Sequence, residues 1–288
     1  MAANTGSTFL WIMLGSELGR LREKAGLSGE QAAKAAACAP STITNLEKGT
    51  TGFRRIGQFT DLLDAYGIDD VGQELLVDWY KNAKGEDWWT PNTSVLPSGM
   101  PAYLGFESGA VGLNTWVPSV VYGLLQTEQY ARALIESAKA ADERTTEFVD
   151  SSVAVRANRK KIITEQGVEL VCVMDEGALR NMVGDPGIMR GQYEEIIRLN
   201  ELPNVTVQII PFSAPAYRVT AGPFTLLHFE PTSLPRPVLS MDTVSHAVQV
   251  ISKPRVVKQF QRRFDFLSRA ALPAHETSAV VERIAREV

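Results

Sequence analysis

The first third of the chain carries apolar residues at helical spacing in several short segments. Leu14, Leu18 and Leu21 recur at intervals of three to four residues, and a similar period returns over residues 56–66 and 71–84, with Ile56 and Leu75 among the residues expected inside. This spacing places apolar side chains on one face of a helix. With two shorter helical stretches between these segments, the pattern predicts an all-α N-terminal domain of five helices over residues 1–84.

The two shorter stretches, about 28–37 and 40–48, are separated by a brief turn. Ser28 is expected to cap the first helix, because its hydroxyl can accept a hydrogen bond from a first-turn N–H. Pro40 suits the first position of the second helix, where no N–H partner is needed. Gly49 can end that helix in the left-handed conformation. The pair is interpreted as a helix-turn-helix. On periodicity alone, an ordinary helical hairpin with a solvated polar face explains it equally well.

The second helix of this pair directs Ile43 and Leu46 inward and leaves short polar side chains outside. Small donors and acceptors suit the edges of bases in a DNA groove. The residues expected to contact or approach base edges are Ser41, Thr42, Thr44 and Asn45. Phosphate contacts, which position a protein on DNA, are expected from Ser28, Gln31, Lys48, Arg54 and Arg55.

Three short sequence motifs in this region match a known pattern: Leu27-Ser28, Ser41-Thr42-Ile43 and Leu46-Glu47-Lys48-Gly49. They resemble the XRE-type, phage-repressor-like helix-turn-helix regulators, and the resemblance implies DNA binding. Gly29 stands where that family usually has a phosphate-contacting glutamine. Ala37 replaces the usual turn glycine, and Pro40 occupies a position that often reads a base. These departures concern the set of DNA contacts and not the fold.

The pattern changes after residue 84. Residues 85–101 are rich in glycine and proline and contain the adjacent Trp88 and Trp89, which predicts a docked linker because tryptophans are rarely left in water. From residue 102 to 288, apolar strand-like runs at 169–174, 205–211, 224–229 and 238–241 alternate with helical segments. This arrangement predicts an α+β C-terminal domain with one small sheet.

The second half also contains recognisable sequence motifs, among them Gly123-Leu124-Leu125-Gln126-Thr127, Ala178-Leu179-Arg180 and Leu202-Pro203-Asn204-Val205. They resemble the large C-terminal domain of actinobacterial WhiJ-like regulators. The resemblance implies a cytoplasmic developmental or stress regulator, often paired with a small neighbouring partner protein. It implies no settled activity for the C-terminal domain.

The distribution of charge says more than the net charge of −4. Residues 14–56 contain seven basic and four acidic residues, whereas residues 61–78 contain six acidic residues and no basic ones. A modest basic face on an acidic protein is more typical of a sequence-specific DNA-binding protein than of one that binds nucleic acid nonspecifically. The two cysteines are too few for a disulfide framework, and the longest apolar runs are too short to span a membrane.

The sequence shows no constellation that supports catalysis. His228, His246 and His275 lack the spacing of metal ligands, so neither a metal nor a cofactor is expected and the protein is not expected to be an enzyme. The basic run from Arg156 to Lys161 is interpreted as a solvated helix face, with a DNA-backbone contact or a surface for an acidic partner as the alternative. An aromatic set could line a ligand pocket, although such residues are more often core: Trp116, Tyr122, Tyr217 and Phe224.

These observations together predict a sequence-specific transcriptional regulator, most economically a repressor that binds a palindromic double-stranded operator as a homodimer. The C-terminal domain would dimerise the DNA-binding heads, sense a small-molecule effector or hold a partner protein. The alternative is an antitoxin-like interaction module that holds a small cognate protein and autoregulates its operon. In either case the protein is expected in the cytoplasm and is not expected to bind a membrane.

Overall fold

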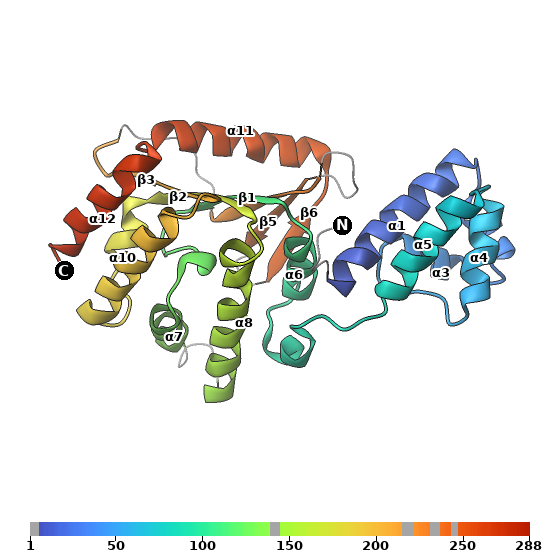
Figure 1. The fold of residues 1–288 in the computed structure, drawn as a ribbon, viewed down its shortest axis with the longest axis horizontal. Helices are drawn as coiled ribbons and strands as arrows, with labels where there is room; N and C mark the ends of the chain where they lie inside the picture. Colours follow the sequence, from blue (N-terminus) through green and yellow to red (C-terminus); the bar gives the residue numbers. More distant parts are fainter. Residues whose placement is uncertain (1–5, 139–144, 215–221, 231–236, 243–246) are drawn as a thin grey trace. The chain divides into compact units, whose positions relative to one another are not determined.

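The computed structural model describes residues 6–138, 145–214, 222–230, 237–242 and 247–288 (Figure 1). The chain divides into two compact units. The N-terminal unit takes in residues 1–90 together with 104–109 and 229–236, and the C-terminal unit takes in residues 91–103, 110–228 and 237–288. Each unit has an apolar core of its own. In the described part of the chain, no helix is both long enough and apolar enough for a membrane span.

The N-terminal unit is built from helices, as the sequence predicts: α1 (Ser7–Lys24), α2 (Gly29–Ala35), α3 (Pro40–Glu47), α4 (Ile56–Ala65) and α5 (Asp70–Asn82). Its core collects the inward faces of these helices, including Leu14, Leu18, Ile43, Leu46 and Phe59. Tyr80 closes this core from α5, because its ring stacks on Phe59 and its hydroxyl donates to the carbonyl oxygen of Phe53 at 2.7 Å.

Three details of this unit differ from the sequence-based expectation. Helix α1 begins at Ser7, before the first periodic leucine, Leu14, and its added turns bury Phe9, whose ring stacks on Phe229. Ile56 and Leu75, expected inside, are 42% and 51% exposed, because Phe59 and Leu76 occupy the inward positions of their helices. Of the tryptophan pair, Trp89 is buried while Trp88 is 43% exposed.

Two glycines allow α1 to approach the end of α3 at backbone contact. A methyl group on Gly15 would lie 2.5 Å from the carbonyl oxygen of Leu46 and 2.7 Å from that of Glu47. Gly49, at a φ of +67° just after α3, would bring its own methyl group to 2.6 Å from the carbonyl oxygen of Trp11. Both approaches are tighter than any side chain tolerates, so glycine is required at each position.

The C-terminal unit contains a six-stranded sheet in the order β3-β2-β1-β4-β5-β6. Its strands are β1 (Gly112–Val117), β2 (Glu169–Asp175), β3 (Val205–Ile210), β4 (Phe224–His228), β5 (Val238–Asp242) and β6 (Val248–Ile251). The strands β1, β2 and β3 pair in parallel, whereas β4, β5 and β6 add in antiparallel fashion beside β1. The predicted α+β domain with a single sheet is confirmed, although β1 and β6 were not expected as strands.

Helices cover both faces of this sheet (Figure 1). On one side lies α11 (Pro254–Ala270), whose Phe260 and Leu267 pack with Trp116 and Leu226 in one apolar cluster. On the other side lie α7 (Glu128–Ser137), α8 (Thr146–Thr164) and α10 (Pro186–Asn200). The remaining elements are α6 (Met100–Ser108), α9 (Glu176–Arg180), α12 (Thr277–Ala285) and the 3₁₀ turns η1 (Thr90–Val95), η2 (Gly123–Leu125) and η3 (Ala274–Glu276).

The contact between α1 and α3 gives a first prediction. Gly15→Ala forces a methyl group against two backbone carbonyls, so we expect it to destabilise the N-terminal unit by about 1–3 kcal/mol. Gly57→Ala is the matched control, because nothing lies within 4 Å of its added methyl group. Hydrogen exchange of the α3 amides measures the local free energy of opening in each variant. Equal protection of α3 in Gly15→Ala and the parent protein would contradict the close approach.

Candidate nucleic-acid interface

Helix α2 begins with a reciprocal cap. The backbone N–H of Gln31 donates to the Ser28 hydroxyl at 3.2 Å, and the backbone N–H of Ser28 donates to the Gln31 side-chain oxygen at 2.8 Å. This capping box satisfies two N–H groups that the start of a helix otherwise leaves unpaired. The predicted Ser28 cap is therefore confirmed, and Gln31 has a structural role that was not expected from the sequence.

The turn between α2 and α3 is held in a left-handed conformation. Ala37 has a φ of +46°, the only positive value at a non-glycine residue in the described chain. The Gln58 side chain, from α4, donates to the carbonyl oxygens of Ala36 and Ala37 at 3.2 Å each. Cys38 packs partly against the core, and burial raises the pKa of its thiol. Gln58 carries no local sequence signal, because its partners lie about twenty residues earlier in the chain.

An ion pair joins α3 to α1. The Arg22 guanidinium donates to the two Glu47 carboxylate oxygens at 2.5 Å and 3.1 Å, and it also donates to the carbonyl oxygen of Leu27 at 2.9 Å. The hydrogen bond to Glu47 raises the pKa of Arg22. One side chain therefore connects α1, the start of the α2 segment and the end of α3. Together with the glycine contacts, this bond fixes the direction in which α3 points.

The residues predicted to read bases lie on the outer face of α3, and they differ in exposure and in the hydrogen bonds that they already make. Ser41, Thr44 and Asn45 are exposed, and Thr42 is half-buried. Thr44 donates its hydroxyl proton to the carbonyl oxygen of Pro40 at 3.3 Å, which leaves it able only to accept. Within the described residues, the side chains of Ser41 and Asn45 make no hydrogen bond, so both retain their full set of donors and acceptors.

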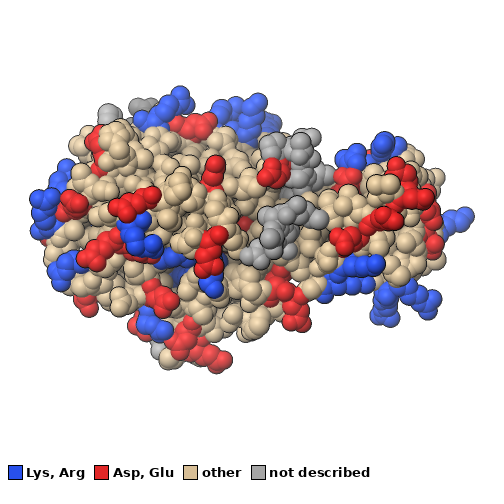
Figure 2. Space-filling view, in the orientation of Figure 1, with Lys and Arg blue, Asp and Glu red and all other residues tan. Residues whose placement is uncertain are grey.

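The predicted phosphate contacts are also exposed. Lys48, Arg54 and Arg55 form no ion pair with any described residue, and each can bring its full charge to a phosphate. Ser28 and Gln31 are engaged in the capping box, yet the serine hydroxyl proton and the glutamine NH₂ group remain available. Figure 2 shows basic side chains along the lower edge of the N-terminal unit and acidic ones across its middle.

Two family models match separate parts of the chain. A family model described as a helix-turn-helix domain matches residues 13–76. A second model, described as the domain of unknown function DUF5753, matches residues 100–283, which is more than half of the chain. The chain belongs to the DUF5753 family. No curated protein and no solved structure matches it.

This member of the DUF5753 family is a DNA-binding regulator with an XRE-like helix-turn-helix at its N-terminus. The family description leaves the activity of its C-terminal domain open. Among the described residues, no group of three histidine, cysteine, aspartate or glutamate side chains could hold a metal ion.

The aromatic set proposed for a ligand pocket is divided by the structure. Tyr122 and Phe224 line a cavity of about 380 Å³ in the DUF5753 domain, although the Phe224 ring packs edge-on against Phe260 on the face of the sheet that α11 covers. Trp116 does not line the cavity, because its side chain is buried on that same face in the same cluster. Tyr217 lies outside the described residues. The expected solvated face of α8 is wrong at Arg159, which is only 8% exposed and lines the same cavity with Arg156.

The turn conformation gives a second prediction. Ala37→Gly relieves a left-handed strain of about 1–2 kcal/mol but makes the unfolded chain more flexible, so we expect a net gain of about 0.5–1 kcal/mol in the stability of the N-terminal unit. The control Ala35→Gly, in the last turn of α2, should lower the stability by about 1 kcal/mol. Chemical unfolding of each variant gives the free energies. Reduced stability in both variants would show that Ala37 is not strained.

Proposed function

We propose that this protein is a sequence-specific transcriptional repressor that binds a palindromic operator as a homodimer. The observation that carries the proposal is the outer face of α3. Asn45 and Ser41 hold unengaged polar groups there, on a helix whose direction is fixed by the contacts of Gly15, Gly49 and Arg22. A rigid helix with available donors and acceptors fits the major groove, where each base pair offers a distinct pattern of partners.

The proposed roles within the head follow from chemistry. The Asn45 amide can form a bidentate pair with adenine, in which its NH₂ group donates to N7 and its oxygen accepts from the N6 amino group. The Ser41 hydroxyl, one turn earlier on α3, suits a neighbouring base edge. Lys48, Arg54 and Arg55 follow α3 in the chain and would hold the adjacent phosphates, which sets the register of the head on the duplex.

Dimerisation is proposed because one head offers few contacts. Helix α3 has eight residues, and Pro40 and Gly29 lack side chains that can hydrogen-bond DNA. Two heads held about one helical turn apart, roughly 34 Å, would read two half-sites at once. The gain would come from the high effective concentration of the second head. We assign this pairing of heads to the C-terminal unit. We also infer kinship with WhiJ-like regulators from the sequence motifs described above.

The assignment of Asn45 gives a third prediction. On an operator recovered by selection from random duplexes, Asn45→Ala should reduce the discrimination between the operator and scrambled DNA by about 1–3 kcal/mol. Asn82→Ala is the matched control, since Asn82 is an exposed asparagine at the end of α5 whose side chain bonds only to Asp78 among the described residues. Quantitative binding to both duplexes measures the difference. An equal decrease in affinity for operator and scrambled DNA would remove the base-reading role.

The assignment of the phosphate contacts gives a fourth prediction. Arg54→Gln and Arg55→Gln should each reduce the slope of log K against log salt by about 0.9, because a variant that neutralises one phosphate fewer also releases one counterion fewer. Arg20→Gln provides the control, as Arg20 is an exposed arginine of the same unit already paired with Glu17. If the Arg54 and Arg55 variants keep the slope of the parent protein, these residues lie away from the DNA backbone.

A further inference from the structure

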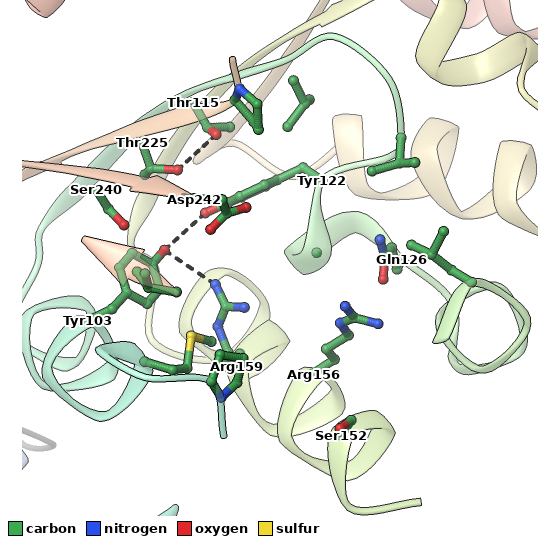
Figure 3. A pocket seen from close by; sticks show the side chains of 18 of the residues that line it. Tyr103, Thr115, Tyr122, Gln126, Ser152, Arg156, Arg159, Thr225, Ser240 and Asp242 are labelled. Atoms are coloured by element: carbon green, nitrogen blue, oxygen red, sulfur yellow. Dashed lines mark hydrogen bonds between the residues drawn. The ribbon is translucent and has the colours of Figure 1, made fainter. Parts of the chain in front are cut away.

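The cavity of about 380 Å³ lies within the C-terminal unit, at the carboxyl end of β1 (Figure 3). Here the sheet changes from parallel pairing with β2 to antiparallel pairing with β4. Helix α8 and the chain that follows β1 supply further lining residues. Open sheets containing parallel strands commonly bind ligands at the carboxyl ends of those strands, and the volume lies within the range of small-molecule sites.

The floor of the cavity is a row of hydroxyl groups. Thr115, Thr225 and Ser240 are direct neighbours across β1, β4 and β5, and all three are buried. Alternate residues of a strand share a face. The neighbouring row on this same face is entirely apolar: Leu113, Leu227 and Val238. The change from apolar to hydroxyl side chains therefore coincides with the cavity.

These hydroxyls are incompletely used by the protein. Thr115 and Thr225 share a hydrogen bond of 2.9 Å, and Thr115 also approaches the carbonyl oxygen of Phe224 at 3.2 Å. The Ser240 hydroxyl has no hydrogen-bond partner among the described residues. A polar group in a core is costly without a partner, so the row suits a ligand that brings polar atoms to the sheet.

Helix α8 adds positive charge above this floor. Arg156 and Arg159 are one turn apart and line the cavity together (Figure 3). The Arg159 guanidinium is held in place by Tyr103: it donates to the hydroxyl at 3.3 Å and lies 5.2 Å from the ring centroid. The described lining contains one carboxylate, that of the exposed Asp242. Arginine recognises anions through charge-assisted hydrogen bonds, and two arginines line this cavity beside the one carboxylate.

A buried acceptor completes the polar lining. Gln126 is 5% exposed, and its amide nitrogen donates to the carbonyl oxygen of Val121 at 2.8 Å. Its side-chain oxygen is buried and accepts no hydrogen bond from any described residue. The remaining wall is largely apolar and includes Leu96, Met100, Leu134, Ile135 and Phe148. The cavity thus offers cations, hydroxyls, one unused acceptor and an apolar wall.

We infer that this cavity binds a small organic anion with an apolar body, whose acid group lies between Arg156 and Arg159. The hydroxyl row and Gln126 meet the polar substituents of this ligand, and the apolar wall meets its hydrocarbon part. The site stands independently of DNA binding. Its use as the effector site of the regulator rests on the proposed function.

The test uses two fluorescent probes that share one aromatic body. 8-Anilinonaphthalene-1-sulfonate carries an acid group, and N-phenyl-1-naphthylamine is its neutral counterpart. The full chain, without DNA, should bind the sulfonate at a single saturable site at least about tenfold more tightly than the neutral probe, since hydrogen bonds to a charged group are stronger than those between neutral groups. Arg156→Gln should weaken sulfonate binding by a similar factor and leave the neutral probe unaffected.

Three further variants distinguish a loss of contacts to the probe from a general loss of stability. Lys161→Gln removes a charge from the exposed side of α8 and should bind both probes as the parent does. Arg156→Lys keeps the charge and should retain most of the affinity, and Ser240→Ala, which removes a hydroxyl from the floor, should weaken binding with little effect on thermal unfolding. Displacement by 4-phenylbutyrate or by phenyl phosphate distinguishes a carboxylate from a phosphate ligand. Equal affinity for the two probes, or unchanged sulfonate binding in Arg156→Gln, would overturn the inference. Operator binding is measured separately, so its failure leaves this result intact.

Discussion

The direction of helix α3, the proposed reading element, depends on the close approach between its end and the backbone of α1. At Gly15 and Gly49 the two segments approach so closely that a single methyl group on either side would collide with main-chain atoms. Backbone contact leaves little freedom to slide or rotate, since no flexible side chain lies between the two segments. The bond from Arg22 to Glu47 then fixes the remaining direction. The exposed positions of Asn45 and Ser41 follow from these contacts.

In the C-terminal unit, the two faces of the sheet differ in composition. The centre of the sheet face covered by α11 is apolar, because Trp116, Leu226 and Leu239 pack there in one cluster. The opposite face carries hydroxyls in register at the carboxyl end of β1, where Arg159 is held by Tyr103. A core that needed only stability would place aliphatic residues there. The polar composition is what a ligand site requires, and this contrast supports the inference of an anion-binding cavity.

The sequence predicted the helical head, the capped helix at Ser28 and four of the six strands, because each depends on local pattern. It missed β1, since Pro118 directly follows that strand and helical spacing precedes it. Trp116 is one of the residues that the sequence offers for a ligand pocket, but its neighbours Thr115 and Val117 line the cavity instead. A shift of one residue exchanges the two faces of a strand. The burial of Arg159 and the clamp made by Gln58 depend on partners distant in sequence, which no local pattern reveals.

The proposed function places two α3 helices in successive major grooves of one operator. Methylation interference on that operator tests it directly, because methylated guanine N7 obstructs the major groove and methylated adenine N3 obstructs the minor groove. We expect the full chain to be excluded by guanine N7 methylation in two patches about 10 base pairs apart on one side of the duplex. Interference from adenine N3 alone, or a single patch of guanine positions, would contradict this placement of the helices.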